Sequence, residues 1–311
     1  MALRVGFLLI PGYALMSHAS ALEPLRAANL LSGRKLYEWE HIAPAGARVA
    51  SSAGAETPCA ATIDTPPPLD LLLVIAGGRP EAFDHAPTFA GLRRAARAGV
   101  RLGGVSGGPV ILARAGVMAG RHMTVHWEHA DTLAEAYPDL LLSRALYVID
   151  RDRVTCAGGV AALDLTHALI AEAHGAALAA RVSDWFLQTE IRPAGDAQRG
   201  GAGERWGVRH PKLAAAYETM EGAVAEPLPR AEIAARVGLS ERQLGRLFSE
   251  KTGKSFSAAY RELRLTRARE LMRRTALPLT EIAYACGFSS PSHFSSAFRA
   301  WAGVSPSRDA S

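Results

Sequence analysis

Short apolar segments alternate with amphipathic segments through the first two thirds of the chain. The apolar segments are nearly continuous and predict strands, whereas the amphipathic segments carry apolar residues at helical spacing and predict helices. The predicted strands are Arg4–Ile10, Leu69–Ala76, Val100–Val105, Leu146–Asp150 and Val154–Cys156. The predicted helices are Ala19–Leu31, Thr88–Ala98, Pro109–Ala115, Glu128–Tyr137, Ala161–His174 and Ala176–Ile191. This alternation favours an α/β fold with a doubly wound, flavodoxin-like, mostly parallel sheet that helices cover on both faces.

The alternating pattern ends at a segment that is rich in glycine and alanine. Residues 193–203 show no apolar periodicity, which is typical of a flexible linker. Only helical patterns follow this segment. We therefore predict a sheet-containing domain at 1–192, a linker at 193–208 and an all-α domain at 209–311.

The predicted helical domain contains an internal repeat. Six residues recur 49 positions later, namely Ile233, Ala234, Val237, Gly238, Leu239 and Ser240 as Ile282, Ala283, Cys286, Gly287, Phe288 and Ser289. After one inserted residue, Leu244 and Phe248 recur 50 positions later as Phe294 and Phe298. Each copy has the pattern of a helix-turn-helix: a short amphipathic helix, a turn glycine, an apolar plug, and a serine that caps a second helix. A compact helical hairpin without a DNA-binding role has the same pattern.

One long helix is predicted between the two copies, at Phe256–Thr275. It carries two apolar stripes, one with Phe256, Tyr260, Leu263 and Leu271 and the other with Leu265, Ala268 and Met272. Two stripes indicate a helix that packs against both flanking units. Its length of about 30 Å would place two recognition helices about one DNA turn (~34 Å) apart.

The net charge is distributed unevenly along the chain. The whole chain has a formal net charge of +5 at pH 7. Residues 1–205 carry 19 basic and 20 acidic side chains, whereas residues 206–311 carry 16 and 10. Residues 230–308 alone carry 14 and 6, a net charge of +8. An excess of this kind indicates either a polyanionic partner or an ordinary solvated surface, and together with the doubled helix-turn-helix it favours double-stranded DNA.

The repeat and its surroundings carry a specific resemblance. The residues that carry it are 233–248, 282–299, Arg264–Arg269 and Gly303–Pro306. With them, residues 211–308 resemble the DNA-binding domain of the AraC/XylS family of transcription regulators. The resemblance implies one exposed recognition helix per copy, which reads base edges in the major groove.

The resemblance also implies which residues face the DNA. The recognition positions are Arg242, Gly245 and Arg246 in the first copy and Ser292, His293 and Ser296 in the second. Arg242 or Arg246 can form a bidentate contact with a guanine, which is worth about 1–3 kcal/mol of discrimination. The expected phosphate or structural contacts are Lys254, Ser255, Arg264 and Arg299.

In the first domain, the predicted strand at 100–105 runs into a glycine-rich turn that contains a serine. Ser106 lies between Gly103-Gly104 and Gly107-Gly108, and a helix is predicted to begin directly afterwards. This pattern is typical of a sharp elbow that presents a side chain at the carboxyl end of the sheet. Such an elbow suits a nucleophile, a ligand anchor or a simple packing turn. The pairs Gly77-Gly78 and Gly158-Gly159 follow other predicted strands and are expected at the same edge.

Five segments of the first domain carry a second resemblance. They are, in chain order, 7–12, 21–29, the Ser106 elbow, 124–127 and 155–164. With them, the domain resembles the class I glutamine amidotransferase-like (ThiJ/PfpI) fold, in the version fused ahead of an AraC domain in GlxA-type regulators. Enzymes of this superfamily have a cysteine at the elbow, whereas this chain has Ser106. His126 lies near the position of the family's histidine, and no carboxylate is clearly placed to complete a triad, with Glu23 the one candidate.

A serine hydroxyl is a weak nucleophile without an activating base, so we predict a ligand-binding domain that has lost catalysis. The expected ligand site contains Ser106, Gly107, Gly77, Gly78, His126, Trp127 and Glu23. GlxA-type regulators respond to small amino-acid or quaternary-amine nutrients and usually activate their catabolism. Trp127 either provides a cation–π face for such a ligand or belongs to the core.

These resemblances together imply a transcription regulator, an activator, that is controlled by a small metabolite. A homodimer and a contact with RNA polymerase are further expectations of the same resemblance. The alternative is a ThiJ/PfpI-type hydrolase or glyoxalase that uses Ser106 and His126 and carries an accessory helical domain.

Cysteine usage and apolar runs exclude several other classes. The three cysteines are scattered, at Cys59, Cys156 and Cys286, and match neither a disulfide framework nor a zinc site. His122, His126 and His129 would share a face only on a helix, whereas the sequence around them is typical of a strand or turn. We therefore predict no metal and no cofactor. The longest apolar run is too short to cross a bilayer and no signal peptide is recognised, so we expect a cytoplasmic protein.

Overall fold

The computed structural model describes residues 1–274 and 277–309. The chain divides into two compact units, Met1–Gln198 and Arg199–Ser311. The division falls within the segment 193–208 that the sequence predicts to be a linker. Each unit has its own hydrophobic cores and is described separately below.

Residues at both ends of the segment 193–208 pack against a unit. The amide of Leu146 in the first unit donates a hydrogen bond of 2.8 Å to the carbonyl of Ala194. In the second unit, Trp206 stacks on Tyr217 with the ring centroids 5.1 Å apart. This glycine-rich segment therefore contributes to both units, through its backbone at Ala194 and through the side chain of Trp206.

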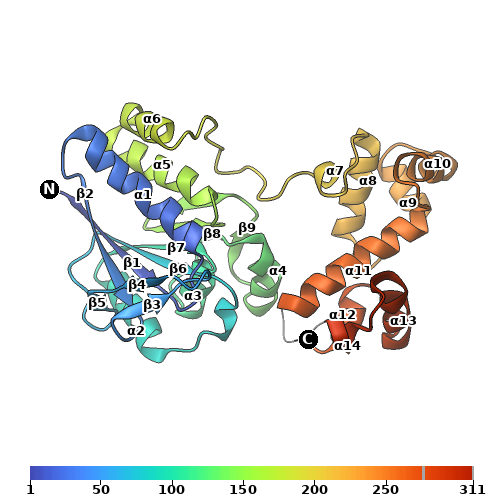
Figure 1. Ribbon diagram of the computed structural model, residues 1–311, viewed down its shortest axis with the longest axis horizontal. Coiled ribbons are helices and arrows are strands. Elements are labelled where there is room, and N and C mark those ends of the chain that lie inside the picture. The colour runs from blue at the N-terminus through green and yellow to red at the C-terminus, as the bar shows by residue number, and fades with distance from the viewer. Residues whose placement is uncertain (275–276, 310–311) are drawn as a thin grey trace. The chain divides into compact units, whose positions relative to one another are not determined.

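A mostly parallel sheet forms the centre of the first unit, all of whose residues are described (Figure 1). Its strands are β1 (Leu3–Leu9), β2 (Tyr37–Ala43), β5 (Ala61–Thr62), β6 (Leu71–Ala76), β7 (Arg101–Ser106), β10 (Tyr147–Asp150) and β11 (Arg153–Cys156). They are ordered β10-β11-β7-β6-β1-β2-β5, and the β10–β11 pair is antiparallel. Two further pairs are β3 (Arg48–Ala50) with β4 (Glu56–Pro58) and β8 (His122–Thr124) with β9 (Leu141–Ser143). The predicted α/β fold with a mostly parallel sheet is confirmed.

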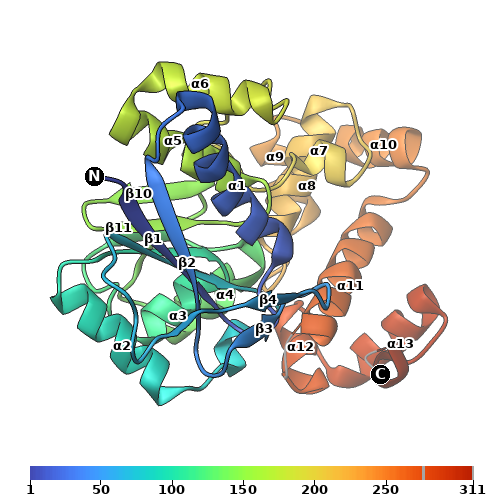
Figure 2. The ribbon, with the colours of Figure 1, turned by 60° about the vertical axis from the view of Figure 1, so that its left-hand side comes forward.

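Helices cover both faces of this sheet, as Figures 1 and 2 show. One face packs against α1 (Leu15–Ser32), α5 (Ala161–His174) and α6 (Ala176–Trp185). The other packs against α2 (Ala86–Arg97), α3 (Gly108–Arg114) and α4 (Trp127–Ala136), with the short 3₁₀ helix η1 (Pro80–Ala82) nearby. Successive residues of β1 alternate between the two cores, with Phe7 and Leu9 in the first and Leu8 in the second. Burial on both faces explains why this strand reads as a continuous apolar run.

The sequence pattern missed β2 and placed the end of α6 too late. Glu38 and Glu40 interrupt the apolar run of β2 and remain half-buried, because only the two-residue β5 lies beyond this strand. The helix predicted at Ala176–Ile191 ends at Trp185. Shortly after that point Leu187 has a φ of 56°, a left-handed conformation that a right-handed helix does not contain.

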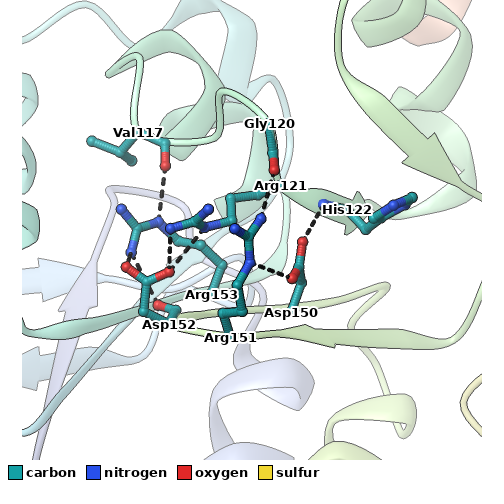
Figure 3. A network of polar contacts seen from close by, with 8 residues as sticks. All are labelled: Val117, Gly120, Arg121, His122, Asp150, Arg151, Asp152 and Arg153. Atoms are coloured by element: carbon teal, nitrogen blue, oxygen red, sulfur yellow. Dashed lines mark hydrogen bonds and ion pairs between the residues drawn. The ribbon is translucent and has the colours of Figure 1, made fainter.

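A network of polar contacts joins β8 to the hairpin of β10 and β11 (Figure 3). Arg153 is almost fully buried, and its Nη1 donates to the carboxylate of Asp152 at 2.7 Å. Asp152 also accepts a bond of 2.9 Å from Arg121, which directly precedes β8. The amide of His122, at the start of β8, donates to the carboxylate of Asp150 at 2.7 Å. These contacts fix the strand that leads into the loop before α4.

The described part of the second unit is helical. Its helices are α7 (Ala202–Arg205), α8 (Pro211–Gly222), α9 (Arg230–Arg236), α10 (Glu241–Thr252), α11 (Phe256–Arg274), α12 (Leu279–Ala285), α13 (Pro291–Ala302) and α14 (Pro306–Asp309). The predicted helix Phe256–Thr275 corresponds to α11, and its last residue, Thr275, lies outside the described residues. The predicted all-α domain is confirmed.

Helix α11 contributes to two separate hydrophobic cores. Phe256, Tyr260 and Leu263 pack in a core with α8, α9 and α10. The second stripe, Leu265, Ala268 and Met272, packs in a core with α12 and α13. The sequence predicts Leu271 on the first stripe, but this residue packs against the second core. It lies three residues after Ala268, a spacing that brings it to the same side of the helix.

Candidate functional site

Each copy of the repeat forms a helix-turn-helix. The first consists of α9 and α10 and turns at Gly238, and the second consists of α12 and α13 and turns at Gly287. Both glycines have a positive φ, of 65° and 70°. At Gly287 a Cβ would also lie 2.5 Å from the carbonyl oxygen of Val224, so this turn requires glycine for space as well as for conformation.

Serine residues cap both second helices. Ser240 forms a capping box with Gln243 at the start of α10. At the start of α13 the hydroxyl of Ser290 accepts a bond of 3.2 Å from the amide of His293. The repeat in the sequence pairs Ser240 with Ser289, which is not the residue that caps α13. The inserted residue of the second copy lies before the cap, so the offset of 50 already applies at Ser290.

The predicted recognition residues lie on the solvent-facing sides of α10 and α13. The exposed residues are Arg242, Arg246, Ser292, His293 and Ser296, while Gly245 is half-buried. The opposite sides of the same helices bury phenylalanine and leucine side chains in the two cores. The Nε atom of Arg246 lies 3.5 Å from the Oε1 atom of Glu250, one turn further along the same helix. Arg242 forms no hydrogen bond or ion pair with any residue that the structure describes.

Arg264 has a structural role within the second unit. Its Nε donates to the carbonyl of Cys286 at 2.7 Å, and its Nη2 donates to the carbonyl of Gly287. Its guanidinium carbon lies 4.2 Å from the centroid of the Phe288 ring. Burial lowers the pKa of this guanidinium. The side chain thus attaches α11 to the turn of the second helix-turn-helix.

The remaining predicted DNA contacts lie at helix ends. Lys254 pairs with Glu262, and the hydroxyl of Ser255 accepts a bond of 3.2 Å from the amide of Ala258 in the first turn of α11. Arg299 is exposed on α13 and forms no ion pair within the part of the chain that the structure describes. Between the two helix-turn-helices, α11 has 19 residues, a length of about 28 Å. This length is close to one turn of DNA, about 34 Å.

In the first unit, Ser106 forms the sharp elbow that the glycines predicted. It is the last residue of β7, it is 7% exposed, and its φ of 61° lies in the left-handed region. The backbone at Gly108 packs so tightly against β6 that a Cβ there would lie 2.0 Å from the carbonyl oxygen of Val74. Gly77 and Gly78 lie beside the elbow, because Ser106 pairs with the last residue of β6. The amide of Gly107 donates to that residue's carbonyl at 3.1 Å.

The loop after β11 closes against the elbow. A Cβ on Gly158 would lie 2.5 Å from the Cβ of Ser106 and 2.8 Å from the hydroxyl of Ser17. That hydroxyl accepts a bond of 2.7 Å from the amide of Gly159. The sequence had not indicated Ser17 as a site residue, although it is buried on the same face of α1 as Ala21, one turn further on.

His126 adjoins the elbow through its backbone. Its amide donates to the carbonyl of Ser106 at 3.3 Å. Its ring Nδ1 accepts a bond of 3.4 Å from the amide of Glu128 and lies 3.7 Å from that residue's carboxylate. The Trp127 ring lies 5.3 Å from the His126 ring. The carboxylate of Glu23 is bound by Arg26 on the same helix, with Nη2 at 2.7 Å.

The cysteines of the first unit lie off the elbow. Cys156 is fully buried, and burial raises the pKa of its thiol to about 12. Burial also raises the pKa of Cys59. Both therefore remain thiols rather than reactive thiolates at neutral pH.

Across residues 1–274 and 277–309, no three His, Cys, Asp or Glu side chains are arranged to hold a metal ion. Within the same ranges, no helix combines the length and apolar character needed to cross a membrane.

A histidine pair that the sequence does not predict joins the buried His18 of α1 to the half-buried His41 of β2. The Nε2 atoms of His18 and His41 are 3.0 Å apart, at hydrogen-bond distance. The His18 ring packs edge-on against Phe7 and Tyr13. Burial, and to a smaller extent His41, lower the pKa of His18 to about 4. The signal in the sequence was a histidine on the buried face of α1, three residues before Ala21.

Two parts of the chain match known families. Residues 4–172 match the DJ-1/PfpI family, and residues 233–310 match a helix-turn-helix domain. The HTH-type transcriptional regulator GlxA of Rhizobium meliloti is 48% identical over 297 residues, which are 95% of this chain and 92% of that protein. The chain is a DNA-binding transcription regulator of the DJ-1/PfpI family. The predicted resemblance to GlxA-type regulators with an AraC-type DNA-binding domain is confirmed.

Further relatives and solved structures are similar to this regulator. The HTH-type transcriptional regulator CdhR of Pseudomonas aeruginosa is 41% identical, covering 97% of this chain and 90% of that protein. A ThiJ/PfpI family protein from Pseudomonas syringae has a TM-score of 0.54 at 25% identity, covering 77% of this chain and 92% of its own. An AraC family transcriptional regulator from Pseudomonas putida has a TM-score of 0.53 at 29% identity, covering 59% of this chain and 99% of its own. The curated relatives are regulators, although the DJ-1/PfpI fold also includes enzymes.

Proposed function

We propose that a small metabolite controls this regulator by binding at the Ser106 elbow, and that the DJ-1/PfpI domain is not catalytic. The observation that carries the proposal is the strained backbone of Ser106, a serine with a φ of 61° at the carboxyl edge of the sheet. A strained conformation of this kind costs about 1–3 kcal/mol and is concentrated at ligand and active sites. The proposed ligand site contains Ser106, Gly107, Gly77, Gly78, His126, Trp127 and Glu23.

The surroundings of Ser106 support binding rather than catalysis. A serine nucleophile needs a base that removes its proton. The Nδ1 atom of His126 already accepts a bond from Glu128, and Glu23 is bound by Arg26. The cysteines of this domain are buried thiols. An enzyme that uses Ser106 and His126 is the outcome that would contradict this part of the proposal.

The proposed ligand is an amino acid or a quaternary amine. Trp127 is half-buried beside His126, and the face of an indole ring attracts cationic ammonium groups. Ligand binding then controls how the recognition residues of α10 and α13 bind DNA. We further propose that the regulator is a homodimeric activator that contacts RNA polymerase, and that it works in the cytoplasm where its promoter lies.

The experiment combines ligand binding with DNA binding on the full chain. A panel of amino acids and betaines is first tested for an increase in Tm. The affinity for a DNA fragment from upstream of the regulator's own gene is then measured by fluorescence anisotropy, with and without any ligand that increases the Tm. Ser106→Ala is expected to weaken the ligand effect, whereas Ser32→Ala, at the far end of α1, is expected to leave it unchanged.

Three results would each contradict a part of the proposal. If Ser32→Ala and Ser106→Ala weaken the ligand effect equally, the ligand does not bind at the elbow. If the protein converts a ligand and Ser106→Ala abolishes the conversion, the domain is an enzyme. DNA binding that does not weaken with salt would contradict the proposed mode of DNA recognition, since phosphate contacts release counterions.

A further inference from the structure

The strap, residues 188–198 between α6 and α7, is bound to the first unit at three points. These points are the first turn of α5, the loop between β9 and β10, and the residues at the end of β8. The sequence predicts a helix as far as Ile191 and a flexible linker from residue 193 onwards, and neither pattern indicates these attachments.

The first attachment is to a buried carboxylate. Asp164 of α5 is fully buried and accepts a bond of 2.8 Å from the side chain of Gln188. It also accepts three bonds from the amide and the guanidinium of Arg192, at 2.6–3.1 Å. A buried charge that loses such partners is strongly destabilising. This end of the strap is therefore firmly held.

The second attachment is made by the backbone of the loop between β9 and β10. The amide of Leu146 donates to the carbonyl of Ala194, and the carbonyl of Leu146 accepts from the amide of Ala157, both at 2.8 Å. Ala157 directly precedes Gly158, the residue that packs against Ser106. Two hydrogen bonds therefore connect the strap with the loop that closes against the elbow.

The third attachment is the side chain of Gln198, the last residue of the first unit. Its Nε2 donates to the hydroxyl of Thr124 at 3.1 Å and to the carbonyls of Val125 and Ala145 at 3.0 and 2.8 Å. Carbonyls cannot donate, so this position requires an N–H group. Val125 directly precedes His126, whose amide donates to the carbonyl of Ser106 at 3.3 Å.

The attachment at Gln198 is the weaker end of the strap. Its Nε2 has two hydrogens for three acceptors, and its Oε1 is buried without a partner in the part of the chain that the structure describes. An unsatisfied buried oxygen opposes docking, because water would bond to it once the side chain is released. The strap is therefore expected to open from Gln198 while Arg192 stays bound to Asp164.

Release of Gln198 would lengthen the connection to the second unit. Ala202, the first residue of α7, is buried in a core of that unit. Only three residues separate it from Gln198, which allows a span of at most about 14 Å. With Ala194 as the last point of attachment, the possible span doubles to about 28 Å. The state of the strap thus sets how much freedom the DNA-binding unit has.

We propose that the strap transmits ligand binding from the elbow to the DNA-binding unit. The docked strap holds the residues before His126 and before Gly158, both of which adjoin the elbow, and so prepares the site for its ligand. By reciprocity, a ligand at the elbow stabilises the docked strap and keeps the connection short. This mechanism rests on the proposed function, because it takes the elbow as the ligand site, but the strap is first tested without a ligand.

Cleavage of the full chain by trypsin after Arg199 measures the docking of the strap. Trypsin binds an extended segment on both sides of the bond it cuts, so the cleavage rate follows the fraction of molecules in which Gln198 is released. Gln198→Ala is expected to speed this cleavage about five- to thirtyfold, the effect of one or two hydrogen bonds. Synthetic peptides of residues 193–204 correct for any effect of the substitution on trypsin itself.

Asp196→Ala is the matched control. Asp196 is an exposed residue of the strap, and its side chain forms no hydrogen bond or ion pair with any residue that the structure describes. This variant is expected to be cleaved at the parent rate. Equal cleavage rates for Gln198→Ala and Asp196→Ala would overturn the proposal.

The link between the elbow and the strap is also tested without a ligand. Gly158→Ala crowds Ser106, whereas Gly159→Ala does not, so only Gly158→Ala disturbs the loop that is bonded to the strap. Gly158→Ala is therefore expected to speed the cleavage after Arg199 more than Gly159→Ala does, in chains whose β1 peptides keep their protection in hydrogen exchange. Equal acceleration would show that the elbow and the strap are independent.

Glycine betaine, a trimethylated amino acid, is the ligand probe. It is expected to slow the cleavage of the parent protein, to bind more weakly to Gln198→Ala by the same factor, and to change the DNA affinity of that variant less than that of the parent. An increase in Tm without slower cleavage would overturn the proposal. If no compound of the panel increases the Tm, the proposed elbow ligand is wrong, and the ligand-free variants still decide whether the strap docks and responds to the elbow.

Discussion

The contact between Gly158 and Ser106 allows a quantitative test of the elbow. In Gly158→Ala the new Cβ would lie 2.5 Å from the Cβ and 2.8 Å from the Cα of Ser106. Overpacking of this kind costs about 1–3 kcal/mol. The φ of Gly158 is +88°, and a left-handed backbone adds about 1–2 kcal/mol for a residue with a Cβ. We therefore expect the first unit to lose about 2–5 kcal/mol of stability.

Gly159→Ala is the matched control, since it separates the two costs. Gly159 also has a positive φ, of 56°, but a Cβ there would have nothing within 4 Å. This variant should lose only the backbone contribution, about 1–2 kcal/mol. The difference between the two variants is then the cost of the contact with the elbow.

Hydrogen exchange followed by mass spectrometry is the assay. Peptides from β7 and β11 report the free energy of opening of the first unit separately from that of the second. The reasoning would be refuted if the two variants lost the same stability to within about 0.5 kcal/mol, the usual spread for unrelated surface changes. In that case the loop after β11 would be free to move away from Ser106.

Three further predictions concern other parts of the protein. Arg242→Ala should leave the Tm unchanged but weaken DNA binding by about 1–3 kcal/mol and alter the base preference, as measured by anisotropy at several salt concentrations. If the base preference stays the same and the slope of log affinity against log salt concentration falls by about 1, Arg242 contacts a phosphate instead. In thermal unfolding, Arg264→Met should destabilise the second unit by about 2–4 kcal/mol, because the carbonyls of Cys286 and Gly287 and the ring of Phe288 lose their cationic partner. The control Arg236→Met, on the surface of α9, should have little effect. Because the pKa of His18 is lowered to about 4, its neutral form stabilises the fold above pH 6.5, and this stability is lost as the pH falls. Between pH 7 and pH 5 urea unfolding should show a loss of about 2 kcal/mol that His18→Gln does not share, and equal losses would contradict this assignment.

The sequence predicted elements well where one local pattern determined them. β1, β6 and β7 are buried on both faces and therefore read as apolar runs. The glycines around Ser106 predicted the elbow because close packing leaves no room for a Cβ there. The repeat predicted both cores of the second unit, since the same apolar spacing occurs twice.

The sequence failed where structure depends on residues far apart along the chain. The bond between Ser17 and Gly159 joins positions 142 residues apart, and no local pattern predicts it. The pairing of His18 with His41 depends in the same way on the position of α1 over β2. The sequence does not decide whether Arg264 contacts a phosphate or has a structural role, because the carbonyls it binds are exposed only by the turn at Gly287.

Helix α11 constrains how the spacing between the two recognition helices can evolve. Leu263 belongs to one hydrophobic core and Leu265 to the other, so a single continuous helix sets both the distance and the rotation between them. Inserting one residue between them would move the second core by about 1.5 Å along the axis and rotate it by about 100°. Only insertions near a whole number of turns keep both reading helices on one side of the DNA. The separation of the two half-sites in target promoters is therefore expected to change in steps rather than continuously among related regulators.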